Sequence, residues 1–191
     1  TAVCFCVVFV GAAGVLWLWP VDTSGLISFM DPASDYHDSV MRISRLSVHD
    51  EHPDVADYCR SIFLSHGEKT ERAVVMYHGY TNCPRQYEDL AQLFFERGYN
   101  VYVPRIPHHG LKNRVNPAVG RLTLAELLRV VDSSVDAAQG LGEQVTVLGL
   151  SMGGVMTAWA AQFRNDIDTA VILVPSFGWY YLPGVIKPML N

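Results

Sequence analysis

Residues 145–154 read VTVLGLSMGG, a run of β-formers that leads directly into the pattern G-x-S-x-G around Ser151. An Ala-rich segment of helical character follows, so the serine stands on a sharp turn between a predicted strand and a predicted helix. Such a turn strains the backbone and leaves almost no room for side chains two residues before and two residues after the serine. Gly149 and Gly153 occupy those two positions, and Ser151 is therefore the candidate nucleophile.

Strands and helices alternate along the chain on both sides of this turn. This alternation, with short connections, is typical of parallel βαβ units in a sheet covered on both faces, so we predict an α/β fold. Thr123 and Glu126 have the spacing of a capping box at the start of one helix. The predicted strands are 62–64, 73–77, 100–106, 144–148 and 169–174, and the predicted helices are 36–46, 84–97, 123–139 and 153–163.

The segment His78-Gly79-Tyr80 follows the predicted strand 73–77 and is a second, independent sign of acyl-transfer chemistry. An enzyme of this kind stabilises the negative oxygen of a tetrahedral intermediate with two preorganised backbone N–H groups. One comes from the residue after the nucleophile, here Met152, and the other from the loop after an early buried strand, here Tyr80. Gly79 would let the backbone approach the substrate closely.

Three motifs occur in order along the chain: 78–80 (HGY), 104–110 (PRIPHHG) and 149–154 (GLSMGG). With them the chain resembles the α/β-hydrolase superfamily, in its esterase, monoacylglycerol-lipase and serine-peptidase-like branch. The resemblance implies an α/β-hydrolase-type core over residues 59–178, with a mostly parallel sheet flanked by helices. The middle motif departs from the family pattern, because His108 stands where such loops often have glycine.

The same resemblance implies roles for the histidines around these loops. In the family the residue at His78 supports the oxyanion loop and is not the catalytic base. The position of His108 and His109 shapes the pocket. The resemblance thus implies His78, Gly79 and His109 as substrate-binding or loop-supporting residues. Cys83 is close to the same loop but lacks a helix start or a histidine of its own, so we interpret it as structural.

A serine hydroxyl needs a base to take its proton and a carboxylate to orient that base. In this fold both follow the serine, yet only Asp166 and Asp168 and no histidine follow Ser151. Both aspartates precede the strand 169–174, so they should lie at the wrong end of the sheet. We therefore expect a fragment that ends before the last strands, with 179–191 as the start of a lid. The alternative is a short protein that has lost catalysis and only binds.

The run from Thr1 to Trp19 contains no charged residue and, as a helix, would span roughly 28 Å, close to the hydrocarbon thickness of a bilayer. We expect residues 1–20 to be a single-pass transmembrane anchor, with a cleaved signal peptide as the alternative. Residues 21–58 would be a linker and lead-in. The stretch after the run is acidic and has no Lys or Arg before Arg42, which favours an extracytoplasmic domain, membrane-anchored or else secreted.

The formal net charge of −5 and the lack of a basic cluster argue against a nucleic-acid partner. No Cys/His spacing typical of a zinc site occurs, so we expect neither a metal nor an organic cofactor. Cys59 and Cys83 could form a disulfide if the domain is exported, or could be two unpaired thiols. Oligomeric state has no signature in the sequence.

Together these features predict a serine hydrolase that acts on a small acyl-ester substrate through an acyl-serine intermediate. The same serine turn would serve a peptidase, a thioesterase or an acyltransferase, since all pass through an acyl-serine. A non-catalytic, membrane-tethered binding module is the alternative from a different class.

Overall fold

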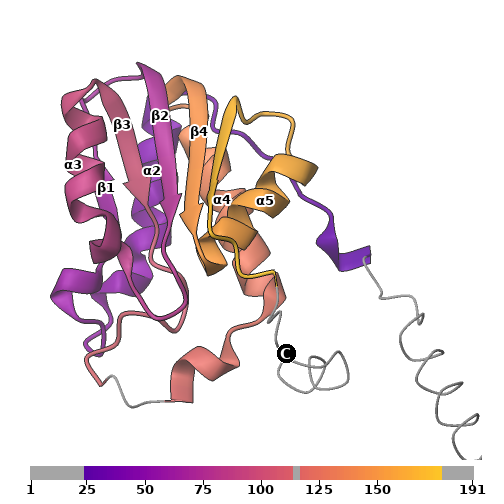
Figure 1. The fold of residues 1–191 in the computed structure, drawn as a ribbon. Helices are drawn as coiled ribbons and strands as arrows, with labels where there is room; N and C mark the ends of the chain where they lie inside the picture. Colours follow the sequence, from indigo (N-terminus) through magenta and orange to yellow (C-terminus); the bar gives the residue numbers. More distant parts are fainter. Residues whose placement is uncertain (1–23, 114–116, 178–191) are drawn as a thin grey trace, which may run out of the picture.

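The computed structural model describes residues 24–113 and 117–177, which contain one five-stranded sheet (Figure 1). The strand order across the sheet is β1-β3-β2-β4-β5. The strands are β1 (Ile62–Leu64), β2 (Thr70–Tyr77), β3 (Tyr99–Val103), β4 (Gly142–Leu150) and β5 (Thr169–Leu173). All five predicted strands are therefore present; β1 has the predicted bounds, and those of the other four are shifted by a few residues.

Pairing in the sheet is parallel everywhere except between β1 and β3. β2 is the central strand and pairs with both β3 and β4. The chain places β3 on one side of β2 and then crosses to place β4 on the other side. In the β2–β4 pair Tyr77 lies opposite Gly149. The segments that follow these two strands therefore emerge side by side, at the kind of strand-order reversal where open α/β sheets bind ligands. The predicted mostly parallel α/β-hydrolase-type sheet is confirmed.

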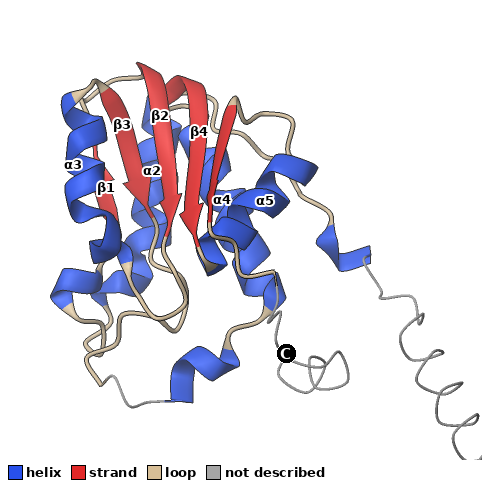
Figure 2. Ribbon diagram, in the orientation of Figure 1, coloured by secondary structure: helices blue, strands red, loops and turns tan. Residues whose placement is uncertain are grey.

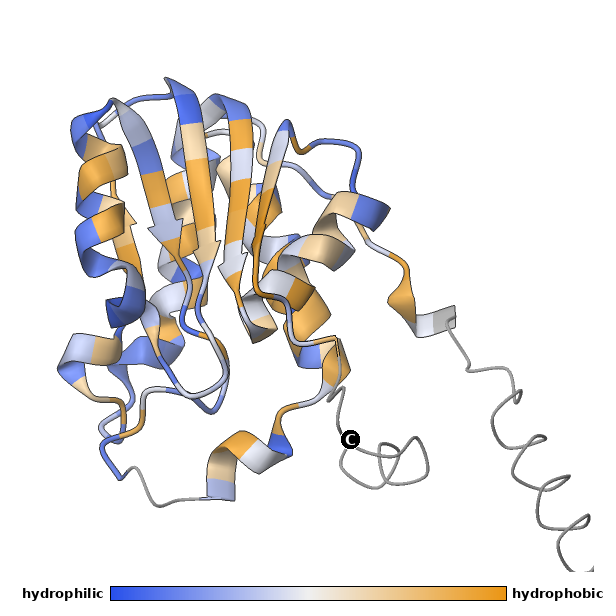
Figure 3. Cartoon of the chain, viewed as in Figure 1, coloured by the Kyte–Doolittle hydropathy of each residue, from blue (hydrophilic) through white to orange (hydrophobic). Residues whose placement is uncertain are grey.

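Helices cover both faces of the sheet, as Figure 2 shows. Successive strand side chains point to opposite faces, so Val74 and Met76 belong to the core cluster that includes α3, while Val75 and Tyr77 belong to the one that includes α4 and α5. Figure 3 shows hydrophobic residues along β2 and β4. The helices are α2 (Tyr36–Ser47), α3 (Glu88–Glu96), α4 (Leu124–Ala138) and α5 (Met152–Phe163), with 3-10 turns η1 (Ser24–Leu26), η2 (Val48–Glu51), η3 (Asp57–Cys59), η4 (Pro84–Tyr87) and η5 (Pro117–Arg121).

Several predicted boundaries differ from those in the structure. The helix predicted from Pro84 is divided into η4 and α3. β3 ends at Val103 because Pro104 has no backbone N–H to continue the ladder. The capping box is present as predicted: the Thr123 N–H donates to Glu126 Oε2 (2.8 Å) and the Glu126 N–H donates to Thr123 Oγ1 (3.3 Å).

The two aspartates after Ser151 lie at the amino end of β5, away from the serine turn. Asp166 pairs with Arg164 (2.7 Å), and Asp168 Oδ2 accepts the Val145 N–H at the start of β4 (2.7 Å). Both carboxylates are therefore engaged at the end of the sheet opposite the serine turn, and Asp168 links β5 to β4 there.

Arg164 is the centre of a buried charge cluster between α4 and α5. Its side chain has 0% exposure, and its guanidinium nitrogens lie 3.0 Å from Asp132 Oδ1 and 2.6 Å from Asp136 Oδ1, besides the contact with Asp166. Asp132 in turn accepts from the Ser28 hydroxyl and the Phe29 N–H, so the cluster also holds the segment before α2.

The segment predicted as linker and lead-in contains α2, whose Ile43 is buried against Ala137 of α4. None of the helices in residues 24–113 and 117–177 is long and apolar enough to cross a bilayer. The predicted anchor, residues 1–20, and the predicted lid segment, 179–191, lie outside the described residues.

Replacing Arg164 by Met should lower the free energy of unfolding by about 3–5 kcal/mol, because it leaves three carboxylates without their buried cation. Urea denaturation measures this loss. The control is Arg42→Met, whose cation pairs with Asp31 and Asp38 on the surface and should cost about 1 kcal/mol or less. Equal losses for the two variants would contradict the importance of the buried cluster.

Candidate active site

The turn that carries Ser151 is strained in the way that the G-x-S-x-G pattern predicts. Ser151 has φ 58° and ψ −114°, a positive φ that is rare for a residue with a side chain, and α5 begins at the next residue. A Cβ on Gly149 would collide with the Gly153 carbonyl, and a Cβ on Gly153 would collide with the Tyr77 carbonyl. The two glycines are thus required by close backbone contact around the serine.

Backbone hydrogen bonds fix the turn from the β5 side. The Ser151 N–H donates to the Leu173 carbonyl (3.0 Å), and the Ser176 N–H donates to the Ser151 carbonyl (3.3 Å). The Ser151 hydroxyl, which is partly exposed, lies 2.8 Å from the Ser176 hydroxyl. Within the described part of the chain no histidine nitrogen lies within hydrogen-bonding distance of Ser151 Oγ.

The loop after β2 brings the second motif against the nucleophile. A Cβ placed on Gly79 would lie 3.6 Å from Ser151 Cβ, so the Gly79 backbone passes directly beside the serine. The Gly79 N–H is already used, since it donates to Gln86 Oε1 (2.9 Å). Among residues 24–113 and 117–177, the Tyr80 and Met152 N–H groups have no acceptor. These two amides are the ones predicted for the oxyanion, and that role stays a prediction.

The direction of the Tyr80 N–H follows from the peptide that carries it. The Gly79 carbonyl accepts the Asn82 N–H (3.0 Å) and lies 3.0 Å from His78 Nδ1. Because a trans peptide is planar, fixing this carbonyl points the Tyr80 N–H the opposite way. Two donors on one carbonyl thus orient the amide.

His78 is part of this bracing and is not placed to act as a base. Its exposure is 0%, and Nε2 accepts the Ile106 N–H (3.2 Å), which leaves the ring proton on Nδ1 for Gly79. Burial lowers the pKa of His78 to about 3, so the ring is neutral near pH 7. Its position matches the loop-supporting role that the resemblance implies.

His109 lies on the other side of the same loop and is 2% exposed. Its Nε2 lies 2.8 Å from the Tyr80 carbonyl and its Nδ1 2.9 Å from the Pro107 carbonyl. The neutral ring has one proton and donates to one of the two at a time; burial lowers the pKa of His109 and keeps that form. The ring also packs edge-to-face on His78 and Tyr80.

The departure at His108 has a conformational reason. His108 has φ 67°, in the left-handed region that glycine enters without steric cost. Its ring Nε2 lies 3.1 Å from Glu126 Oε1 at the start of α4, so the side chain contacts the helix instead of the serine turn.

The sequence did not predict the ion pair between Arg105 and Asp50, which supports the loop after β3. Arg105 Nε lies 2.6 Å from Asp50 Oδ1, with both side chains buried, and Arg105 Nη1 donates to the His109 carbonyl (3.1 Å). A charged residue between two prolines in a mostly apolar stretch was the available signal. Gln86 was missed too, because nothing local marks a surface-helix glutamine as a partner of Gly79.

Cys59 and Cys83 form a disulfide with their Cα atoms 5.3 Å apart. The bridge borders a cavity of about 710 Å³ between the Tyr80 loop and the loop after β3. Residues that line it include Tyr58, Tyr80, Arg85, Gln86, His109 and Leu111. No group of three or more His, Cys, Asp or Glu side chains in the described ranges is arranged to hold a metal ion.

Parts of the chain match a protein family and two curated proteins. Residues 68–190 match the family Hydrolase_4, described as serine aminopeptidase, S33. A thermostable monoacylglycerol lipase of Bacillus sp. (strain H-257) is 30% identical over 94 residues, 49% of this chain and 36% of the lipase. The phospholipase YtpA of Bacillus subtilis (strain 168) is 30% identical over 101 residues, 52% of this chain and 38% of that protein.

A solved structure from work on LipS and LipT, two metagenome-derived lipolytic enzymes, is 28% identical. The match covers 59% of this chain and 44% of that chain, with a TM-score of 0.48. In the two curated relatives, the lipase and the phospholipase, the region that matches this chain spans less than two fifths of their length.

The buried His78 should make the protein less stable as the pH falls. Its folded-state pKa of about 3 is below the reference value of 6.5, so the unfolded chain binds one more proton between these values. The free energy of unfolding is therefore highest above the reference value of 6.5 and falls as the pH decreases. This one histidine should lower it by on the order of 2 kcal/mol between pH 7 and pH 5.

The variant His78→Gln tests this effect, because its amide oxygen can still accept the Ile106 N–H but does not titrate. Urea unfolding at pH 7 and pH 5 should show a smaller difference for this variant than for the unaltered protein. His109 contributes in the same direction, so part of the pH dependence should remain. The exposed His37→Gln serves as control, and an unchanged difference in His78→Gln would refute the assignment.

Proposed function

The chain belongs to the Hydrolase_4 family of α/β-hydrolases, and on that premise we propose that it is a serine hydrolase of carboxylic esters. One observation carries the proposal: the strained Ser151 stands beside two backbone N–H groups, of Tyr80 and Met152, that have no acceptor in the described part of the chain. Acyl transfer needs a nucleophile next to two unused amide donors.

In the proposed reaction Ser151 Oγ attacks the ester carbonyl as its proton passes to a base. The carbonyl oxygen becomes negative and accepts hydrogen bonds from Tyr80 and Met152. Collapse of the tetrahedral intermediate expels the alcohol and leaves an acyl-serine, which water then hydrolyses. His78 and His109 hold the loop that carries the Tyr80 amide.

The base and its carboxylate have no candidates beside Ser151 in the residues that the structure describes. His78, His108 and His109 each have the other contacts given above, and Asp166 and Asp168 are engaged at the far end of the sheet. We propose that a histidine and an acid from outside these 191 residues complete the triad.

The ester substrate is proposed from the two curated relatives, which are named a monoacylglycerol lipase and a phospholipase. The family description, serine aminopeptidase, favours a second candidate, hydrolysis of an amide at a peptide amino end. Both reactions use the same acyl-serine, so the serine turn does not choose between them.

We also propose that the domain is exported and is held at a membrane by residues 1–20. The disulfide supports this proposal, because such bonds persist in oxidising compartments and are rare in the cytosol of mesophiles. Alkylation of whole cells before and after reduction tests it. Cys59 and Cys83 should be blocked until the reductant is added; labelling of both without reductant would exclude an oxidised, exported domain.

The catalytic proposal predicts that Ser151→Ala, in the protein expressed from its complete gene, lowers hydrolysis of p-nitrophenyl butyrate by about three orders of magnitude or more. Labelling by a fluorophosphonate probe should disappear with it, since the probe bonds to the activated hydroxyl.

The matched control is Ser133→Ala, whose hydroxyl, within the described part of the chain, donates to carbonyls of its own helix and should change neither signal. Comparing the p-nitrophenyl ester with an aminoacyl p-nitroanilide separates the two candidate substrates. Complete absence of Ser151-dependent hydrolysis and labelling would favour a non-catalytic binding module.

A further inference from the structure

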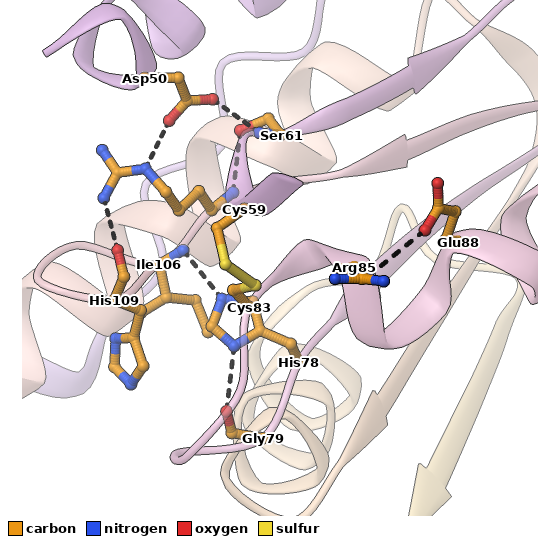
Figure 4. The surroundings of a disulfide bond; sticks show 11 residues. Asp50, Cys59, Ser61, His78, Gly79, Cys83, Arg85, Glu88, Ile106 and His109 are labelled. Carbon is orange, nitrogen blue, oxygen red and sulfur yellow. Dashed lines mark hydrogen bonds and ion pairs between the residues drawn. A yellow bond between two sulfur atoms is a disulfide. The ribbon is translucent and has the colours of Figure 1, made fainter. Parts of the chain in front are cut away.

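The Cys59–Cys83 disulfide joins two short segments, which are also in contact where the Arg85 guanidinium lies 5.2 Å from the centre of the Tyr58 ring. Cys59 ends η3 and Cys83 directly precedes η4, and both are buried with Ala56 in a small cluster of their own. Figure 4 shows the bridge between the Asp50–Ser61 hydrogen bond and the contact of the His78 ring with the Gly79 carbonyl. Ala56, Cys59 and Cys83 bury little apolar surface, so the covalent bond is an important part of the connection between the two segments.

One route leads from Cys83 to the peptide beside Ser151. The Cys83 carbonyl accepts the Gln86 N–H (2.9 Å), which starts the η4 turn. Through its side chain Gln86 accepts the Gly79 N–H (2.9 Å), and the Asn82 N–H closes the turn on the Gly79 carbonyl (3.0 Å). The position of Cys83 thus determines where Gln86 places the Gly79 backbone.

A second route leads from Cys59 to the opposite side of the same turn. Gly110, at φ 71°, lies so close that a Cβ on it would be 2.6 Å from Cys59 Cβ. Its carbonyl accepts the Ala56 N–H (2.9 Å). The preceding residue, His109, contacts the Tyr80 carbonyl through Nε2 (2.8 Å).

We propose that the Cys59–Cys83 disulfide is a positioning element of the oxyanion hole. It fixes the turn 79–82 from the Gln86 side and from the His109 side, and so aims the Tyr80 N–H at the oxygen of the tetrahedral intermediate. This inference rests on the proposed function. The bridge touches no substrate atom; it acts on the transition state through Gln86, Gly110 and His109, and its loss should lower kcat and leave KM nearly unchanged.

Reduction of the full-length protein provides the first test. Dithiothreitol gives two electrons and two protons to the bridge, leaves two thiols, and is itself oxidised to a cyclic disulfide. Hydrolysis of p-nitrophenyl butyrate, measured where the protein stays folded, should lose on the order of tenfold to a hundredfold in kcat, since a displaced oxyanion donor has effects of this size. Reoxidation should restore it.

Two variants separate positioning from general stability. The double variant Cys59→Ala/Cys83→Ala should have the low kcat and no further response to dithiothreitol. Asp168→Ala removes a hydrogen-bond acceptor at the opposite end of the sheet, so it should be less stable yet keep kcat. An equal loss of kcat in Asp168→Ala, or no loss on reduction of an active protein, would overturn the proposal.

Hydrogen–deuterium exchange decides the inference even if the protein hydrolyses no ester. On reduction, amide exchange should rise about tenfold or more in residues 78–86 and 105–111 and stay constant in α4. Unchanged exchange in both loops rejects the positioning role, whatever the activity. Faster loop exchange without any Ser151-dependent hydrolysis would support the bridge as a clamp on the turn and reject the esterase proposal instead.

Discussion

The pairing of β2 with β4 determines where the rest of the site can be. Parallel pairing of Tyr77 with Gly149 makes the chain leave both strands at the same edge, so Gly79 passes beside Ser151. The approach is so close that Gly153 must lack a side chain under the Tyr77 carbonyl. The strained serine and the amide donors are consequences of this one pairing. The Cys59–Cys83 disulfide lies further from the serine, and we infer that it adjusts only the direction of the Tyr80 N–H, whose place the strand pairing determines.

Features encoded by neighbouring residues were predictable from the sequence. The serine turn, the five strands and the Thr123–Glu126 capping box each have a signature within a few neighbouring residues of the sequence, and each is present. The sheet type followed from the order of strands and helices. Boundaries were less accurate, as at Val103, where the proline after the strand ended it earlier than its run of β-formers suggested.

Features that depend on distant residues were not predictable. Asp50 and Arg105 are 55 positions apart, and nothing in either neighbourhood says that they meet inside the protein. For the same reason the sequence left Cys59 and Cys83 open between a bridge and two thiols. Around the candidate site, the residue types and order indicated Ser151, Tyr80 and Met152, and the resemblance implied support from His78 and His109, but nothing indicated Gln86. The hydrogen bond from the Gly79 N–H to Gln86 depends on how the turn 79–82 packs against η4, and the local sequence does not specify that packing.

The Arg164 cluster constrains how this sequence can vary over evolutionary time. Its one guanidinium is shared by Asp132, Asp136 and Asp166, which come from α4 and from the approach to β5. Loss of the arginine first would bring three negative charges together, and loss of the acids first would leave a cation in the interior. Either single step passes through a destabilised ancestor. The four positions should therefore change as a coordinated set among descendants, or not at all.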